Sequence, residues 1–437
     1  MKNIISIISS FFILGTSYAQ KPKDIATRFA SENTASLFQQ YQYLHAHPEV
    51  STQEKNTSAL LKSEMRALGC KIIENMGYYN FAAIMENGNG PVLLYRTDMD
   101  GLPILEKTNL PYASKDSSIK DGNLVPSMHA CGHDIHMSTW LGLARLMSNN
   151  KKQWKGTLIF LAQSAEETGQ GARKAVATDA FKQLPTPSAQ LAIHDHAELQ
   201  TGQIGFCNGY SMAAVDMMDI TIFGKGGHGA APQNCIDPIV IAAQYINTIQ
   251  TIVSRNLSSN DPAIVTVGAI HGGTVGNIIP DQVQLRLTIR SYSAEARTTI
   301  LNRLKQIGDQ LALSAGMSND KLPQYQLLDM SIPSVYNNPD LGDRIKNIIS
   351  TNFGEVATAP MKPIMLGEDF GVYGQLTSKI PSYILWTGTL NAARKNEASK
   401  NGTAIPQLHT AGFAPDAAAT LEANVSILGT CLLEMMK

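Results

Sequence analysis

The sequence predicts an α/β protein, in which a mainly parallel sheet with flanking helices is interrupted by an inserted α+β domain. Two observations lead to this prediction. Strand-like and helical runs alternate from residue 25 to about residue 213, which is typical of parallel strands joined by crossover helices. From residue 214 the runs follow another order, and α/β character returns near residue 382. With 437 residues and 43% hydrophobic content, the chain can build two cores.

The first domain opens with helical patterns over residues 25–49 and 51–69. In the second pattern, Ser51 and Glu54 have the spacing of a capping box, and Gly69 is a suitable stop. Apolar segments and one helix follow in alternation, with strands expected at 80–86, 91–100, 156–163 and 190–194 and the helix at 138–148. We therefore expect helices on both faces of the sheet.

The inserted domain is predicted from the order of its elements. We expect a strand at 215–224, a helix at 237–255, two strands at 263–270 and 281–293, a helix at 295–316 and a last strand at 325–329. This β-α-β-β-α-β order is that of a ferredoxin-like unit. The boundaries are therefore 20–213 and 330–437 for the first domain and 214–329 for the insertion. The second part of the first domain holds a strand at 382–388 and a long helix after Asp416.

The first 19 residues have the pattern of a signal peptide. Lys2 precedes a short apolar run, Ile4 to Gly15. Ser17 and Ala19 are small residues at the two positions that a signal peptidase recognises. We expect cleavage after Ala19 and a secreted or periplasmic protein; an uncleaved anchor is the alternative. No other stretch is long and apolar enough to cross a membrane.

Charge and cysteine content exclude several classes of protein. The net charge of -1 and the absence of long Lys or Arg runs argue against binding to nucleic acid or to a membrane surface. Five scattered cysteines are an odd number and do not form a disulfide framework. Sequence alone does not choose a pair among Cys70, Cys207, Cys235 and Cys431.

Side chains of the kind that bind metals gather at the expected strand ends. Three strands end in such groups, and a loop adds two more: Asp98 and Asp100, Glu166 and Glu167, His194, and Cys131 with His133. The carboxyl ends of parallel strands face one crevice, so these groups are expected to converge. Crowded carboxylates repel unless cations separate them, and a mixed Cys, His and Glu set suits zinc, manganese, cobalt or nickel.

Each of these groups also has a structural interpretation when it is taken alone. A single Cys-x-His usually occurs in a loop without a metal ion. Adjacent glutamates favour the positive end of a helix dipole, and Asp134 could cap the helix that follows it. Their joint placement at strand ends is what favours a metal site.

Several motifs then identify a family. The motifs that occur in family order are "LHAHPEVSTQE", "RTDMDGLP", "MHACGHDIH", "AQSAEETGQGA", "GKGGHGAAP", "GGTVGNIIPD", "GEDFGVY" and a late "LH". The chain resembles the metal-dependent amidohydrolases that include hippurate hydrolase, bacterial N-acyl-amino-acid amidohydrolases and indole-acetyl-amino-acid hydrolases. The resemblance covers nearly the whole mature chain.

The resemblance implies a role for each matching residue. The positions that ligate two divalent metal ions are Cys131, His133, Glu167, His194 and His409. Glu166 matches the general acid and base, and Asp100 matches a carboxylate that orients a ligand. The inserted domain is implied to be a lid and dimerisation domain of a homodimer. Three residues of this domain match substrate-binding positions. His228 matches a residue that often reaches the site of the partner subunit, and Asn277 and Arg290 match residues that bind the substrate's carboxylate.

The remaining histidines receive structural roles. We expect His129 and His136, with Asp134, to orient the loop or cap the helix, and His45 and His47 to pack. His196 is expected to be an accessory pocket residue and His271 a local one. Departures from the family pattern include Ser164 in place of proline and Ile135 in place of glycine. Neither change affects a metal position, so they bear on pocket shape and substrate preference.

The predicted function is the hydrolysis of N-acyl amino acids by an exported enzyme with two metal ions. A carboxypeptidase or dipeptidase on the same fold is the alternative, with a short peptide as its substrate. A cysteine hydrolase with Cys131 as nucleophile is a different class, but His133 is only two residues away and poorly placed as its base. A catalytically silent binding module is a third class, and no ligand position is replaced in the way it would predict.

Overall fold

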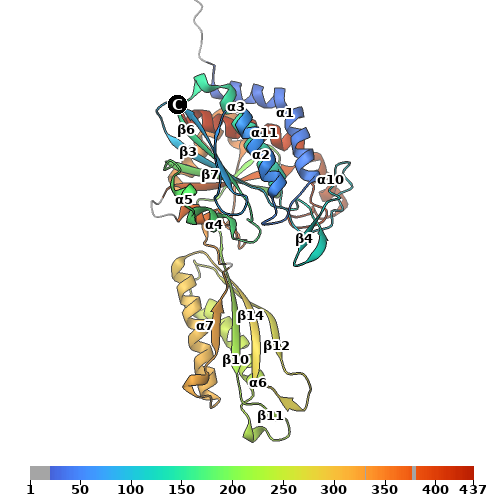
Figure 1. Cartoon of the computed structure of the whole chain (residues 1–437), viewed down its shortest axis with the longest axis vertical. Coiled ribbons are helices and arrows are strands. Elements are labelled where there is room, and N and C mark those ends of the chain that lie inside the picture. Colours follow the sequence, from blue (N-terminus) through green and yellow to red (C-terminus); the bar gives the residue numbers. More distant parts are fainter. Residues whose placement is uncertain (1–19, 330, 376–379) are drawn as a thin grey trace, which may run out of the picture.

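The computed structural model describes residues 20–329, 331–375 and 380–437 (Figure 1). The predicted signal peptide, residues 1–19, lies outside this range. Among the described residues, no helix is both long enough and apolar enough to cross a membrane.

The larger sheet has eight strands in the order β1-β2-β6-β3-β7-β18-β8-β17. In this order they are Lys71–Ile73, Phe81–Asn87, Gly156–Gln163, Val92–Asp98, Ala189–Gln200, Ser382–Leu390, Ile204–Phe206 and Thr358–Pro360. The four middle strands, β6, β3, β7 and β18, are parallel, which confirms a mainly parallel central sheet. Towards the edges, β1, β2 and β8 pair antiparallel. Several of these edge strands have only three residues and carry no periodic signal.

Helices cover both faces of this sheet because its strands are apolar on both sides. In β6, Leu158 and Phe160 join the core beneath α1, α3 and α11, whereas Ile159 and Leu161 join the opposite core with α4 and α9. The helices are α1 (Pro22–Ala46), α2 (Lys55–Ala67), α3 (His133–Asn149), α4 (Gly171–Ala177), α5 (Asp179–Lys182), α8 (Pro339–Phe353), α9 (Gly371–Gly374), α10 (Ala392–Asn401) and α11 (Ala417–Met435).

The segment between β9 (Gly209–Met212) and β16 (Val335–Asn337) forms a second sheet with its own core. Its four antiparallel strands have the order β12-β14-β10-β15, and they are Ile264–Gly272, Gln282–Ser291, Ala214–Phe223 and Gln324–Leu327. Helices α6 (Pro238–Asn256) and α7 (Ala294–Ser314) pack on one face, where Ile220, Leu285, Tyr245 and Leu304 are buried together. Figure 1 shows this unit at one end of the long axis. The elements follow the expected β-α-β-β-α-β order; the role of the unit as a lid or dimerisation domain remains a prediction.

Three short ribbons complete the fold. They are β4 (Ser117–Lys120) with β5 (Asn123–Pro126), β9 (Gly209–Met212) with β16 (Val335–Asn337), and β11 (Gly227–His228) with β13 (Ile278–Ile279).

The predicted capping box at Ser51 and Glu54 is wrong. Helix α2 begins at Lys55, and no side chain caps it. Ser51 Oγ instead donates to Asp100 Oδ2 at 2.6 Å. Glu54 Oε1 accepts the backbone N–H groups of Thr52 and Ala165, at 3.0 and 2.7 Å. Both side chains hold the loops at the carboxyl ends of the strands, so tertiary contacts override the local motif.

Candidate metal centre

The loop before α3 positions the first two predicted ligands. Cys131 is followed by Gly132, the N-cap residue of α3, with φ +81°, a left-handed conformation that favours glycine. A Cβ atom on Gly132 would lie 2.2 Å from Asp195 Oδ2, so the glycine also allows this loop to approach β7 closely. His133 is the first residue of α3 and is fully buried.

Three other predicted ligands lie around the Cys131 thiol. His409 Nε2 is 3.1 Å from Cys131 Sγ, and His194 Nε2 is 3.6 Å from it. Glu167 Oε1 is 3.4 Å from His409 Nε2. Strand β7 continues beyond the predicted end, so His194 lies within it, opposite Trp386 of β18. The histidine nevertheless faces the same site.

His133 connects this group to the two glutamates. Its Nδ1 lies 2.8 Å from the carbonyl oxygen of Asp100, to which it donates, so in the neutral imidazole the lone pair is on Nε2. Nε2 is 3.9 Å from both Glu166 Oε2 and Glu167 Oε1. Asp100 Oδ2 accepts the backbone N–H of Glu167 at 3.0 Å. Asp100 therefore contacts both His133 and Glu167, and its role in orienting a metal ligand stays a prediction.

Unpartnered polar atoms mark this site as one that suits metal ions. His133 Nε2, Glu167 Oε1 and Asp100 Oδ1 are buried and have no hydrogen-bond partner. Buried polar atoms without partners are unfavourable in a folded protein unless a ligand satisfies them. The donor set of sulfur, imidazole nitrogen and carboxylate oxygen fits zinc and similar divalent cations. The residues present therefore fit the predicted metal ions.

The electrostatics of the cluster favour a cation in the same place. Burial lowers the pKa of His133, but Asp98 and Asp100 outweigh it and raise the pKa to about 10. Burial lowers the pKa of His194 to about 3, which keeps its imidazole neutral and able to ligate. The carboxylates that attract a proton to His133 would equally attract a divalent cation.

Two residues of the site have strained backbone conformations. Ala165, just before Glu166, has φ +55°, and His409 has φ +61°. Such values are uncommon outside glycine and persist only where the surroundings fix them. Glu54 fixes Ala165 through its N–H, and the carbonyl of Ala130 accepts the N–H of His409 at 2.8 Å. The conformation of His409 is compatible with the contact of 3.1 Å between its Nε2 and Cys131 Sγ.

Glu166 lines a cavity of about 450 Å³ beside these ligands. Burial, followed by the charges of Glu368 and Glu167, raises the pKa of Glu166 well above its usual value. Arg290, from β14, lines the same cavity. His228 and Asn277 do not line it; both are exposed in the β11–β13 region, where the N–H of Gly229 donates to the carbonyl of Asn277 at 2.9 Å. Figure 1 shows β11 at the end farthest from the large sheet.

His136 and His129 do not belong to the group around Cys131, although His136 lies close to His133 and Asp98 in a second group that could hold a metal ion. His136 Nδ1 lies 2.7 Å from Asp98 Oδ1, and its Nε2 accepts the N–H of Asp195 at 3.0 Å, so both ring nitrogens are used. Both ring nitrogens of His129 are buried without a partner, and burial lowers its pKa to about 4. The expected helix cap by Asp134 is not formed; its side chain pairs with His45 instead.

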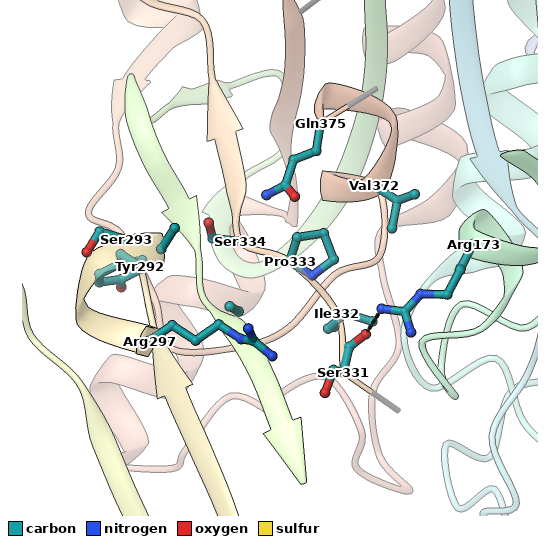
Figure 2. Close-up of a pocket in the computed structure, with 12 residues that line it drawn as sticks. Arg173, Tyr292, Ser293, Arg297, Ser331, Ile332, Pro333, Ser334, Val372 and Gln375 are labelled. Atoms are coloured by element: carbon teal, nitrogen blue, oxygen red, sulfur yellow. Dashed lines mark hydrogen bonds between the residues drawn. The ribbon is translucent and has the colours of Figure 1, made fainter. Parts of the chain in front are cut away.

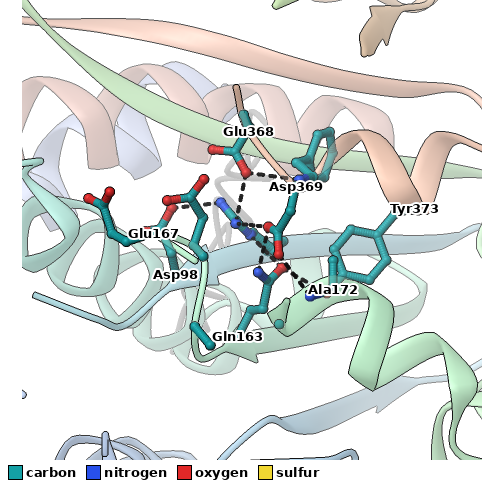
Figure 3. Close-up of polar contacts among 12 residues, drawn as sticks. Asp98, Gln163, Glu167, Ala172, Glu368, Asp369 and Tyr373 are labelled. Carbon is teal, nitrogen blue, oxygen red and sulfur yellow. Dashed lines mark hydrogen bonds and ion pairs between the residues drawn. The ribbon is translucent and has the colours of Figure 1, made fainter. Parts of the chain in front are cut away.

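A buried cluster around Arg96 was not predicted from the sequence; Figure 3 labels its partners Asp98, Gln163, Glu368 and Asp369. Arg96 donates to Asp98 Oδ2 at 2.6 Å, Glu368 Oε1 at 2.9 Å and Asp369 Oδ1 at 3.2 Å, and to Gln163 Oε1 at 3.1 Å. This cluster joins the ends of β3 and β6 to the segment before α9. An arginine inside an apolar strand was the available signal, because a buried charge requires partners.

A second cavity, also of about 450 Å³, lies beside the chain crossing at 331–334 (Figure 2). Arg173 donates there to the carbonyls of Asp329 and Ser331. Arg297 forms two hydrogen bonds of 2.7 Å with Asp216. Both arginines are thus occupied by structural contacts, and no histidine, cysteine or carboxylate is among the described residues that line this cavity.

The cysteines outside the site are not bridged. Cys70, Cys207, Cys235 and Cys431 are all free thiols among the described residues. Burial raises the pKa of Cys70 to about 11 and that of Cys431 to about 12.

His45 has a larger role than the packing expected of it. It is buried between Asp134 Oδ2, 2.7 Å from its Nδ1, and Glu106 Oε1, 3.1 Å from its Nε2. Burial opposes protonation, but the two carboxylates raise the pKa to about 9. Because the folded pKa exceeds the unfolded one of about 6.5, the stabilisation is complete below about pH 6.5 and lost towards pH 9.

We therefore expect the free energy of unfolding to fall by about 3 kcal/mol between pH 6.5 and 9.5 through His45 alone. Urea unfolding at both pH values measures the fall. His45→Gln should remove this part of the pH dependence, and His47→Gln, at an exposed position in the same turn, should retain it. An equal fall in both variants would assign the pH dependence to other groups.

Comparison with known proteins agrees with this site. The model of Peptidase family M20/M25/M40 matches residues 94–408. An N-acetylcysteine deacetylase of Bacillus subtilis (strain 168) is 36% identical over 349 residues, which cover 79% of this chain and 86% of the relative. An N-acetyldiaminopimelate deacetylase of Lactobacillus helveticus (strain DPC 4571) is 34% identical over 408 residues, covering 92% and 98%.

A solved structure of the M20 family is also similar to this chain. The YXEP protein of Bacillus subtilis, a dinuclear metal-binding peptidase of the M20 family, superposes with a TM-score of 0.74 and 28% identity. The match covers 93% of this chain and 99% of that one. Because the family model spans most of the chain and both relatives align along most of their length, this chain belongs to Peptidase family M20/M25/M40 and is a hydrolase of amide bonds.

Proposed function

We propose that this chain is an exported hydrolase that removes the acyl group from N-acyl amino acids, with two divalent metal ions and Glu166 as general base. The observation that carries the proposal is the set of unpartnered nitrogen and oxygen atoms around Cys131, next to a carboxylate that lines a cavity. The relatives named as N-acetylcysteine and N-acetyldiaminopimelate deacetylases support the substrate class.

Each residue has a defined task in this proposal. The two ions would be held by Cys131, His133, Glu167, His194 and His409. When bound, such ions lower the pKa of water and polarise a carbonyl group. Glu166 takes a proton from the attacking water and later donates it to the nitrogen of the leaving amine. Glu167 would bind the ions, so the two adjacent glutamates would have separate roles, one as a metal ligand and the other as general acid and base. Arg290 binds the substrate's carboxylate.

The test is hydrolysis of N-acetyl and N-benzoyl amino acids, and of dipeptides, by the purified protein. We expect hydrolysis of the acyl amino acids, loss of activity with a chelator, and recovery with added zinc, manganese, cobalt or nickel. Elemental analysis of protein purified without added metal would identify the native ion. Activity that persists after complete metal removal would instead favour Cys131 as a nucleophile. Preference for dipeptides would favour the carboxypeptidase or dipeptidase alternative.

We also propose that the chain forms a homodimer through the inserted unit. β12 is an edge strand of its sheet, with Ile264 and Ile270 exposed by 40% and 50%, and Val240 of α6 is exposed by 53%. Exposed edge strands with apolar side chains are sites of association. A dimer would also give His228 and Asn277, which lie outside the cavity of their own chain, a site in the partner.

The mass in solution tests this proposal. We expect a dimer for the mature protein and a monomer for Ile264→Lys combined with Ile270→Lys. Leu124→Lys, at a position 72% exposed in β5, is the matched control and should remain dimeric. A monomeric mass for the unmodified protein would contradict the proposal.

Export has a separate test. If residues 1–19 are a signal peptide, the protein isolated from outside the cytoplasm should begin at Gln20. Mass spectrometry of the intact protein distinguishes this form from an uncleaved, anchored one.

A further inference from the structure

The cavity beside the candidate metal centre contains one cation suited to a carboxylate. Arg290 of β14 lies directly opposite Val215 of β10 in the antiparallel register. Its Nη1 donates to the carbonyl oxygen of Met365 at 3.3 Å. The side chain is half-buried, and burial lowers its pKa; no carboxylate of the described residues forms an ion pair with it. An arginine in this state is suited to an anion that arrives from outside.

The surroundings of Arg290 are apolar. Val215 exchanges backbone hydrogen bonds of 3.0 and 2.9 Å with Ile332. A Cβ atom placed on Gly367 would lie 2.4 Å from Val215 Cγ2, 2.7 Å from Ile332 Cδ1 and 3.6 Å from Arg290 Nη1. These side chains therefore meet within a few ångströms of the guanidinium. Met212 and Met217, whose flexible thioethers adapt to the shape of an apolar group, line the same cavity.

The cavity contains no second pair of charges for a substrate. Among the described residues that line it, the only charged or histidine side chains besides Arg290 are Glu166, Glu167, His194 and His409. All four belong to the proposed metal and acid–base machinery. A substrate with further charges on its side chain would lose water there and gain no partner, which is unfavourable.

We propose that the preferred substrates are N-acyl amino acids with an uncharged, apolar side chain, which Val215, Ile332 and Met217 bind while Arg290 holds the carboxylate. This inference rests on the proposed function. The side chain of an amino acid is attached to the carbon next to its carboxylate, so anchoring at Arg290 places it against this apolar wall. Of the two substrates named for the relatives, N-acetylcysteine fits this cavity and N-acetyldiaminopimelate, with its charged distal end, does not.

The experiment measures kcat/KM of the metal-loaded protein for N-acetyl derivatives that differ only in the side chain. We expect N-acetylmethionine and N-acetylleucine to exceed N-acetylglycine by about 10-fold or more, and N-acetyldiaminopimelate by about 100-fold. Val215→Thr keeps the shape and adds a hydroxyl group. It should reduce the ratio of N-acetylmethionine to N-acetylglycine by about 10-fold, and Met217→Thr should act in the same direction.

Val356→Thr is the matched control, because Val356 is 77% exposed and does not line the cavity. It should leave the ratio unchanged. Equal rates across the series, a preference for N-acetyldiaminopimelate, or unchanged ratios in both cavity variants would overturn this inference and leave the proposed function intact. Failure to hydrolyse any N-acyl amino acid, N-acetylglycine included, would instead overturn the proposed function.

Discussion

Glu166→Gln should reduce kcat by about 10²- to 10⁴-fold while the protein keeps its metal ions. Glutamine has the shape of glutamate, but its amide cannot take a proton from water or pass one to the leaving amine. The side chain of Glu166 lines the cavity, and its Oε2 is 3.9 Å from the lone-pair nitrogen of His133. Steady-state kinetics on an N-acetyl amino acid and elemental analysis of the same preparation measure the two quantities.

Two matched variants separate catalysis from metal binding. Glu167→Gln changes the neighbouring residue, whose Oε1 is buried without a partner among the ligands, and should lose metal as well as activity. Glu198→Gln, at an exposed position near the site, should retain both. Full turnover in Glu166→Gln would assign the general base to another group.

The structure brings the predicted ligands together because their positions follow from the topology of the sheet. β3 ends at Asp98 and β6 at Gln163, three residues before Glu166, so parallel strands bring these segments to one edge of the sheet. Local expectations were less reliable. The strand that carries His194 continues to Gln200 because β18 lies alongside it. Ser51 contacts Asp100 rather than a helix end, which only the folded chain could show.

The residues predicted to bind substrate show a different limit. Arg290 reaches the cavity because β14 runs beside β10, and this pairing follows from the predicted element order. His228 and Asn277 lie on the same unit but at its far end. A family position identifies the residue type but does not show whether its side chain lines the cavity of the same chain.

The Arg96 cluster could have been suspected from the sequence, but its partners could not have been assigned. Arg96 interrupts an apolar strand, and a buried guanidinium must find carboxylates or carbonyls. Two of its partners, Glu368 and Asp369, lie more than 270 residues away along the chain. Asp369 also accepts the N–H of Ala172 at 2.9 Å, which ties α4 to the same point. The cluster therefore fixes the loop that carries Glu166 on both sides.

Arg96→Met should lower the free energy of unfolding by about 3–5 kcal/mol, since it leaves buried carboxylates without their cation. Arg96 and its three acidic partners are at most 1% exposed, so water cannot replace the lost hydrogen bonds. Urea unfolding of the metal-free protein measures the change without a contribution from metal binding.

The controls for Arg96→Met distinguish a buried ion pair from an exposed one. Arg66→Met removes an arginine that is 55% exposed and paired with Glu74, and it should cost no more than about 1 kcal/mol. Arg96→Lys keeps the charge but cannot make the four contacts of a guanidinium, so we expect an intermediate loss. If Arg96→Met unfolded at the same urea concentration as the unmodified protein, the buried carboxylates would have to be protonated in the folded state. The cluster would then stabilise the Glu166 loop through neutral hydrogen bonds alone.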